Sequence, residues 1–274
     1  MKYVAIVAFI IRLIDKVSPN LAARISVEML FRPLSSSRGK KEEAFWETGK
    51  PIEFLSGCRG RVFGAGGERC VWILHGWKSR GSKLKKLITA CVENGCEVIA
   101  WDGPAHGDSP GRRSSLAPYT EILVGDINSS EKKPDAIMGH SFGGAASAYA
   151  CQLGITPQRL VLISAASSTV GVFERYWNFI GLGAKARNKF MEIVERETGV
   201  EVDSMSSVNF ISTLPQKVLV IHDDEDELVP LSDAIKLKDI RPDVEIFKTH
   251  GLGHNRVLRD ERVCARASQF VTNN

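Results

Sequence analysis

Gly139-His140-Ser141-Phe142-Gly143-Gly144 is the most informative stretch of this chain, because it matches the pattern G-x-S-x-G. It follows the apolar run Ala136–Met138, which is typical of a buried strand, and it opens a helical pattern that ends near Leu153. A serine in a tight turn between a strand and a helix needs small neighbours, because its backbone is strained and the flanking chain packs closely. The helix N-terminus also places partial positive charge beside a developing oxyanion. Ser141 is therefore the candidate nucleophile, and Gly143 is expected to support the turn.

Short apolar runs alternate with longer helical patterns on both sides of this turn. The predicted strands are Ile52–Ser56, Arg61–Gly64, Cys70–Leu74, Glu97–Trp101, Ala136–Gly139, Leu160–Ser164, Lys217–Ile221 and Val244–Thr249. The first two predict an antiparallel hairpin, and the later ones are near-continuous apolar runs, as in strands covered on both faces. The predicted helices are Lys83–Asn94, Ser115–Ser129, Phe142–Leu153, Asp233–Asp239 and Asn255–Thr272. This alternation predicts an α/β fold with an eight-stranded, mostly parallel sheet and helices on both faces.

The partners that a nucleophilic serine needs follow the last two predicted strands. A serine hydroxyl needs a base, and the base needs an orienting acid. In this architecture they follow in the order serine, acid, histidine. Lys217–Ile221 is followed by the acidic run Asp223 to Glu227, and Val244–Thr249 is followed by His250-Gly251-Leu252-Gly253-His254.

Within each cluster one residue is favoured. Asp226 lies on the loop that turns at Pro230, whereas Asp223 at the strand edge is expected to cap the turn. Asp223 and Asp224 remain alternatives for the acid. We favour His254 as the base because it stands on a glycine-flanked loop; the alternative is a local hydrogen bond at a helix N-terminus.

An oxyanion hole is expected from the amide after the nucleophile and from the loop after an earlier strand. Cys70–Leu74 leads into His75-Gly76-Trp77, where Gly76 lets the backbone turn its amide inward. The backbone amides of Trp77 and Phe142 are the predicted donors. We expect His75 to hold this loop by hydrogen bonding, and His106 and His140 to be structural or pocket-lining.

One segment is too long for an ordinary crossover between strands. About fifty residues separate Ser164 from Lys217, and Val172–Glu197 carries aromatic and aliphatic residues at helical spacing. The pattern predicts a helical cap inserted at 169–213, with the core at 51–168 and 214–274 and a helical extension at 1–50. The alternative is a long two-helix connection that only covers the sheet.

The N-terminus begins with the apolar run Tyr3–Ile11, which has the length of a signal-peptide core. Arg12 and Asp15 follow at once, and the run is too short to span a bilayer. An amphipathic pattern continues beyond Pro19. The two alternatives are helices that pack on the body or make peripheral membrane contact, and a cleaved signal.

The composition is that of a soluble globular protein, with 43% hydrophobic and 25% charged residues in 274. A net charge of +4 does not favour nucleic-acid binding, which usually needs a clustered basic face. The six cysteines are scattered without zinc-ligand spacing, which indicates buried thiols in a reducing compartment. We therefore expect a cytoplasmic protein with no metal and no cofactor.

From Pro51 onward the chain resembles the α/β-hydrolase family. The matching elements are the His75-Gly76-Trp77 turn, the Asp102–Gly107 turn, the Gly139–Gly143 elbow, the Asp226–Pro230 acid loop and the Gly253-His254 end loop. The resemblance implies a small-molecule carboxylic ester or thioester substrate and an acyl-enzyme mechanism, in which Ser141 attacks a carbonyl, His254 moves the proton and water releases the acid. Members that dehalogenate or open epoxides use an aspartate nucleophile, and Ser141 argues against both. The alternatives are an acyltransferase with the same three residues and a non-catalytic binding protein.

Basic residues crowd the segment after the oxyanion loop: Lys78, Arg80, Lys83, Lys85 and Lys86. They indicate either a rim that attracts an anionic substrate or a solvated loop and helix face.

Overall fold

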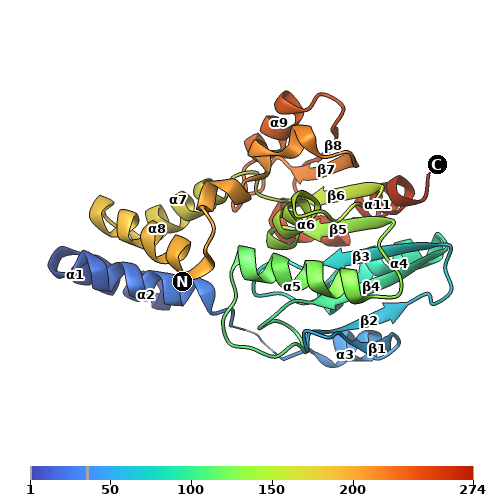
Figure 1. The fold of residues 1–274 in the computed structure, drawn as a ribbon, viewed down its shortest axis with the longest axis horizontal. Coiled ribbons are helices and arrows are strands. Elements are labelled where there is room, and N and C mark those ends of the chain that lie inside the picture. The colour runs from blue at the N-terminus through green and yellow to red at the C-terminus, as the bar shows by residue number, and fades with distance from the viewer. Residues whose placement is uncertain (1, 35–36, 274) are drawn as a thin grey trace.

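The computed structural model describes residues 2–34 and 37–273, and the side chains of residues 2–5 are outside the description. Ser35, in the predicted extension, and the first side chains of the Tyr3–Ile11 run therefore lie outside the described residues. An eight-stranded sheet forms the centre (Figure 1). Its strands are β1 Lys50–Glu53, β2 Arg59–Phe63, β3 Arg69–Leu74, β4 Cys96–Asp102, β5 Ala136–His140, β6 Arg159–Ile163, β7 Lys217–Asp223 and β8 Glu245–Thr249.

The strand order is β1-β2-β4-β3-β5-β6-β7-β8. β2 pairs antiparallel with both β1 and β4, and all other neighbours pair in parallel. The predicted α/β fold with an eight-stranded, mostly parallel sheet is confirmed, and so is the antiparallel hairpin at its edge.

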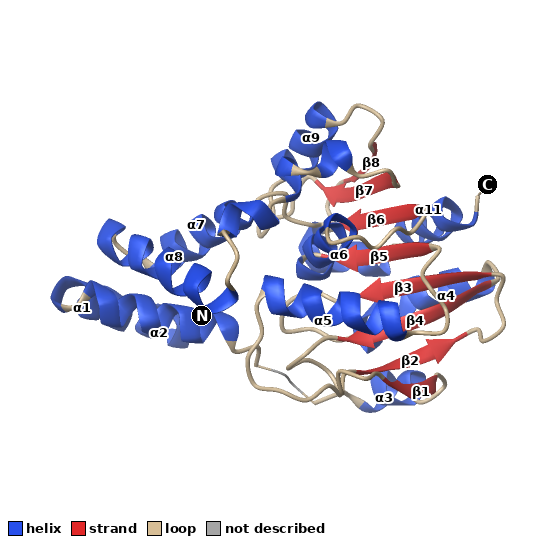
Figure 2. Cartoon of the chain, viewed as in Figure 1, coloured by secondary structure: helices blue, strands red, loops and turns tan. Residues whose placement is uncertain are grey.

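Helices cover both faces of the sheet (Figure 2). α5 (Leu116–Ser129) and α6 (Phe142–Gln152) lie on one face, and α4 (Lys85–Glu93) and α11 (Glu261–Thr272) lie on the other. Because successive strand residues point to opposite faces, Trp72 joins the core under α5 and α6 while Val71 and Ile73 join the core under α4 and α11. Two cores on one sheet explain why the central strands are apolar throughout.

The remaining helices are α1 Lys2–Val17, α2 Pro19–Phe31, α3 Lys40–Trp46, α7 Thr169–Ile180, α8 Ala184–Thr198, α9 Leu231–Ile240 and α10 Gly253–Arg256. Short 3₁₀ turns occupy Gly81–Leu84, Val202–Met205, Ser207–Asn209, Ile211–Thr213 and Val257–Arg259. The single helix predicted over Asn255–Thr272 is wrong. Asp260 is extended and its carboxylate accepts the amides of Arg262 and Val263, so it caps a new helix, α11, behind α10.

α1 and α2 pack against α7 and α8 as a four-helix arm beyond the carboxyl edge of the sheet (Figure 1). The Tyr176 hydroxyl donates to the Ser26 carbonyl at 2.9 Å, and the Gly183 amide donates to the Asp15 carboxylate at 2.6 Å. Buried Ile11 and Phe190 belong to one apolar cluster. The N-terminal helices therefore lie on the segment predicted to be a cap. In the described part of the chain, no helix has the length and apolar character needed to cross a membrane.

Candidate active site

Ser141 stands at the turn between β5 and α6 with φ 53° and ψ −117°, a conformation that L-residues rarely adopt. The turn is tight on both sides. A Cβ on Gly139 would lie 2.3 Å from the Gly143 carbonyl oxygen, and a Cβ on Gly143 would lie 2.5 Å from the His75 carbonyl oxygen. The glycines of the motif are therefore required by close backbone approach, and they hold the strained serine in place.

His254 lies between Ser141 and Asp226. Its Nε2 is 2.9 Å from the Ser141 Oγ, and its Nδ1 is 2.7 Å from the Asp226 Oδ2. The other carboxylate oxygen of Asp226 accepts the amides of Leu228 at 3.0 Å and Val229 at 2.9 Å. Burial alone would raise the pKa of Asp226, but the hydrogen bonds from His254 and these amides hold it below its ordinary value. An ionised Asp226 keeps the proton of His254 on Nδ1 and leaves Nε2 free to accept the Ser141 proton.

The other candidates for the acid and the base lie elsewhere. Asp223 accepts the Gly253 amide at 2.8 Å, the Leu252 amide at 3.1 Å and the Thr249 hydroxyl at 2.7 Å. It therefore ties the end of β7 to the loop that carries His254, which is the capping role expected of it.

Asp224 and His250 pair with each other, and their nearest polar atoms are 2.9 Å apart. Lys248 is also 2.9 Å from Asp224. This exposed cluster is separate from the hydrogen bonds that join Asp226, His254 and Ser141.

His140 contacts the backbone of His254. Its Nε2 donates to the His254 carbonyl at 2.9 Å, and burial lowers its pKa to about 4, so the ring is neutral at physiological pH. The hydrogen bond fixes the backbone of His254, which makes His140 a positioning residue.

The predicted oxyanion loop runs directly beside the nucleophile. A Cβ on Gly76 would lie 3.0 Å from the His140 Nδ1 and 3.3 Å from the Ser141 Cβ, so a side chain here would crowd the site. The rings of Trp77 and Phe142 are in contact, with centroids 4.8 Å apart. Both residues line the same cavity as Ser141, which is where amide donors to an oxyanion have to stand.

Two histidines join the loops under this site. His75 Nε2 accepts the Gly103 amide at 3.1 Å, and His106 Nε2 accepts the Lys78 amide at 3.2 Å. Burial lowers the pKa of both, to about 3 for His75, so each ring is neutral and can accept. These two hydrogen bonds join the loop that carries Trp77 to the turn after β4.

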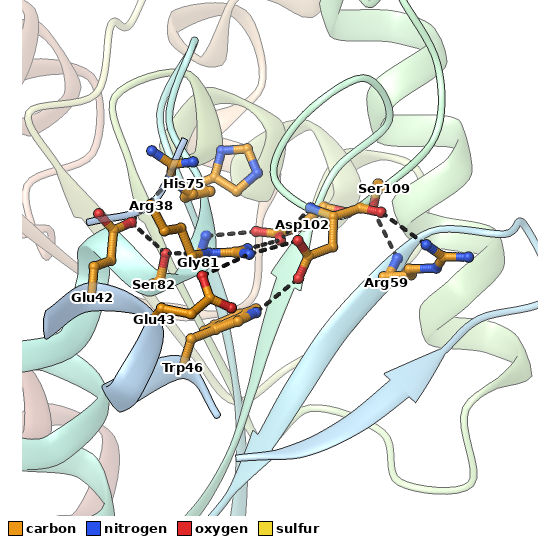
Figure 3. Close-up of polar contacts among 12 residues, drawn as sticks. Arg38, Glu42, Glu43, Trp46, Arg59, His75, Gly81, Ser82, Asp102 and Ser109 are labelled. Carbon is orange, nitrogen blue, oxygen red and sulfur yellow. Dashed lines mark hydrogen bonds and ion pairs between the residues drawn. The ribbon is translucent and has the colours of Figure 1, made fainter. Parts of the chain in front are cut away.

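The N-terminal segment also reaches this region, through buried Asp102 at the end of β4 (Figure 3). Its carboxylate accepts the Gly81 amide at 2.6 Å, the Asp108 amide at 2.9 Å and the Arg38 guanidinium at 3.3 Å. Burial raises the pKa of Asp102 to about 6 against these hydrogen bonds. Trp46 of α3 donates to Asp108 at 2.9 Å. The polar stretch before β1, which is part of the predicted helical extension, thus holds α3 and an ion pair between Arg38 and Asp102 that was not predicted.

The basic segment after the oxyanion loop makes its contacts away from the candidate site. Arg80 and Lys83 pair with Glu42 at 2.9 Å and 2.5 Å. Lys85 lies over the Phe45 ring, 4.9 Å from its centroid. In the described structure none of the five basic residues is part of the cavity wall beside Ser141.

A mostly apolar cavity of about 260 Å³ opens beside Ser141 and His254. Its wall combines the arm with the core: Leu30 and Phe31 from α2, Val172, Phe173 and Arg175 from α7, Val194 and Thr198 from α8, with Met205, Leu116, Leu228 and Val229 among the others. Among the described lining residues there is one Arg and no Asp or Glu. The contribution of α2 was missed, although the amphipathic pattern that ends at Leu30 was visible in the sequence.

The sheet order, the strained serine turn and the helical arm over the carboxyl edge define an α/β hydrolase. The family model described as serine aminopeptidase, S33 matches residues 67–210, more than half of the chain, and the chain belongs to this family. No curated protein matches the chain in sequence.

Solved structures of three hydrolases share the fold. An esterase from Pyrococcus furiosus superposes with a TM-score of 0.65 at 15% identity, covering 88% of this chain and 97% of the esterase. A monoacylglycerol lipase from Paleococcus ferrophilus gives 0.62 at 20% identity, covering 78% and 98%. A meta-cleavage product hydrolase from Pseudomonas fluorescens gives 0.60 at 20% identity, covering 81% and 97%. At such identities the likeness shows the fold.

Proposed function

We propose that this α/β hydrolase cleaves a carboxylic ester or thioester through an acyl-enzyme intermediate, with Ser141 as nucleophile, His254 as base and Asp226 as acid. The observation that carries the proposal is the position of His254, 2.9 Å from the Ser141 Oγ and 2.7 Å from the Asp226 carboxylate. A hydroxyl becomes a useful nucleophile only when an oriented base stands within hydrogen-bond distance of it.

In the proposed first half-reaction the Ser141 Oγ attacks the carbonyl carbon while His254 Nε2 takes its proton. The charge that develops on the carbonyl oxygen is stabilised by the amides of Trp77 and Phe142, each of which contributes about 3 kcal/mol in the transition state. His254 then gives the proton to the departing alcohol or thiol, which leaves the acyl group on Ser141. Asp226 stays ionised and stabilises the imidazolium.

In the second half-reaction water takes the place of the leaving group. His254 accepts a proton from the water as the oxygen attacks the acyl carbonyl. Collapse of this intermediate releases the carboxylic acid and returns the proton to the Ser141 Oγ.

The cavity wall supports an uncharged acyl group as the part of the substrate that is bound. Leu30, Phe31, Val172 and Phe173 offer apolar contact. A peptide with a free α-amino group would need a carboxylate partner, and none is found among the described residues of the wall. We therefore favour esters and thioesters over amino-terminal peptides. The names of the structural neighbours, an esterase and a monoacylglycerol lipase, agree with this choice.

The test is turnover of acyl esters and thioesters of increasing chain length by the purified protein, with Ser141→Ala as the inactive variant. A fluorophosphonate probe should label the wild type and not Ser141→Ala. His254→Asn should abolish turnover, whereas His250→Asn, which changes the exposed histidine of the same loop, should not. No turnover and no labelling would identify a non-catalytic binding protein. Acyl transfer to an added alcohol or thiol in preference to water would identify an acyltransferase.

We further propose that residues 51–168 and 214–274 form the hydrolase core and that residues 169–213 form the cap. The helices of the 1–50 extension are then a second part of the cap. A reducing compartment such as the cytoplasm is supported by the cysteines, all six of which are buried with free thiols. The compartment can be tested by fractionating the source cells, where recovery of the protein from an oxidising compartment would contradict this proposal.

A further inference from the structure

The outer face of α1 is an uncovered apolar stripe. Its members recur at helical spacing and their side chains are about half exposed or more: Ile6 55%, Phe9 60%, Ile10 47%, Leu13 47% and Val17 87%. The opposite side of the helix, with Ala8 and Ile11, is buried against the rest of the arm. α1 is therefore apolar on two sides, and only one of them is covered by protein.

The polar groups of α1 point away from the middle of this stripe. Asp15 accepts the Gly183 amide at 2.6 Å, and the Nε of Arg12 donates to the Ile180 carbonyl at 3.3 Å. The two contacts are with the turn between α7 and α8 and with the last residue of α7. Lys16 is exposed beside the stripe, one turn of helix from Arg12. The stripe thus has a basic edge, and the one described acid of α1 is turned toward the α7–α8 turn.

The next acid along the arm is also neutralised by cations. Glu28 of α2 is 2.8 Å from Arg32 and 3.0 Å from Arg113. Arg24 of α2 and Arg32, which directly follows the helix, are exposed. Residues 2–32 carry five Lys and Arg against two Asp and Glu, and this excess of positive charge favours an anionic partner.

Further apolar side chains are exposed on the arm beyond α1. Leu21 at the start of α2 and Phe179 near the end of α7 are exposed. The other end of α2 carries Leu30 and Phe31 into the wall of the cavity beside Ser141. The arm protrudes from the body of the protein (Figure 1).

We infer that the α1 stripe docks the protein on an anionic lipid bilayer, with α1 lying in the plane of the interface. A helix of 16 residues is about 24 Å long, which is shorter than the roughly 30 Å hydrocarbon core, so α1 lies on the membrane and does not cross it. The apolar side chains enter the acyl boundary, while Lys16 meets lipid phosphates at the edge of the stripe. The exposed side chains of the stripe are apolar and suit the acyl region of a bilayer, while its basic edge suits anionic headgroups. Docking is independent of the proposed reaction.

The test is co-sedimentation of the full chain with vesicles of phosphatidylcholine alone and with an equal mixture of phosphatidylcholine and phosphatidylglycerol. We expect binding to the mixed vesicles, and a loss of about tenfold or more in the partition coefficient for Phe9→Ser/Leu13→Ser. The matched control is Leu153→Ser/Ile240→Ser. It also removes two exposed apolar side chains, but at the ends of α6 and α9, which run back to the amino edge of the sheet. Lys16→Glu should weaken binding to the mixed vesicles.

Both double variants should keep the wild-type thermal midpoint and the wild-type rate with a short, water-soluble ester. Their folding and the proposed reaction are thus measured separately from docking, and an inactive wild type would count against the reaction alone. Wild-type protein that binds neither vesicle, or Phe9→Ser/Leu13→Ser protein that binds like the wild type, overturns the inference. A dimer in sedimentation velocity that Phe9→Ser/Leu13→Ser converts to a monomer would assign the stripe to a second copy of the chain, and it would also overturn it.

Discussion

The substitution Asp226→Asn tests whether Asp226, and not another residue of the acidic run, is the acid of the proposed mechanism. The amide oxygen of the new side chain can still accept the Leu228 and Val229 amides, as Asp226 does at 3.0 Å and 2.9 Å. The NH₂ group would then face His254 Nδ1 and force the ring proton onto Nε2, where it points at the Ser141 Oγ. In that tautomer the ring cannot accept the serine proton. The corresponding change in a serine protease lowers kcat about 10⁴-fold, or about 5 kcal/mol, and we expect a similar loss here.

The assay is kcat and kcat/KM for a soluble ester, with Asp224→Asn as the matched control. Asp224 carries the same group two positions earlier, but it pairs with exposed His250 and Lys248. We expect this control to stay within about twofold of the wild type, because exposed ion pairs contribute little. A loss below tenfold in Asp226→Asn, or equal losses in both variants, would refute the assignment of the acid.

Three further predictions concern the loop, the cavity and the stability of the fold. Gly76→Ala places a Cβ 3.0 Å from the His140 Nδ1, and kcat for ester hydrolysis should fall about tenfold or more while the thermal midpoint changes little. Leu30→Trp narrows the α2 side of the cavity, so kcat/KM should fall for long acyl esters and hold for acetyl esters in a chain-length series. Acid should destabilise the protein between about pH 6 and pH 5. Buried His75 and His140 take up their protons on unfolding, since their native pKa values are about 3 and 4. Asp102 has the opposite effect on stability. Its raised pKa of about 6 means that the native state binds a proton in this pH range while the unfolded state does not. Burial also lowers the pKa of His106, so the net uptake on unfolding is at least about one proton, and the unfolding free energy should drop by about 1.4 kcal/mol or more per pH unit. Urea unfolding at the two pH values measures this slope, and a flat or opposite slope would contradict it.

The parts of the site that could be predicted from sequence are those in which the chemistry is set by local backbone geometry. The G-x-S-x-G turn can be recognised in the sequence because a strained serine between a strand and a helix needs glycine on both sides. In the structure, a Cβ added at Gly139 or Gly143 would lie within 2.5 Å of a backbone atom. Asp223 could be placed as a capping residue for the same reason. The loop at the end of a strand needs an acceptor for its amides, and Asp223 is the first acid available there.

The parts that could not be predicted depend on contacts between segments far apart in the chain. Arg38 and Asp102 are 64 positions apart, and no sequence pattern around either residue indicates that they form an ion pair. The prediction of one continuous helix over Asn255–Thr272 failed on a subtler point. The period of the apolar pattern runs through Asp260, and only the extended conformation at that residue starts a new helix there.

The arm shows most clearly what an amphipathic pattern does and does not contain. The pattern in residues 4–30 indicates that α1 and α2 each have an apolar face to bury, but it does not predict which surface covers that face. The same is true of α7 and α8, whose aromatic residues could have packed on the sheet alone. In the structure the two incomplete pairs cover each other, and Phe31 and Phe173 meet in the wall of a single cavity beside Ser141. The extension is consequently part of the proposed binding site. Among the described side chains of α1, those on the uncovered side are apolar residues whose exposure the arm itself does not explain, which is why we assign this side to a partner outside the chain.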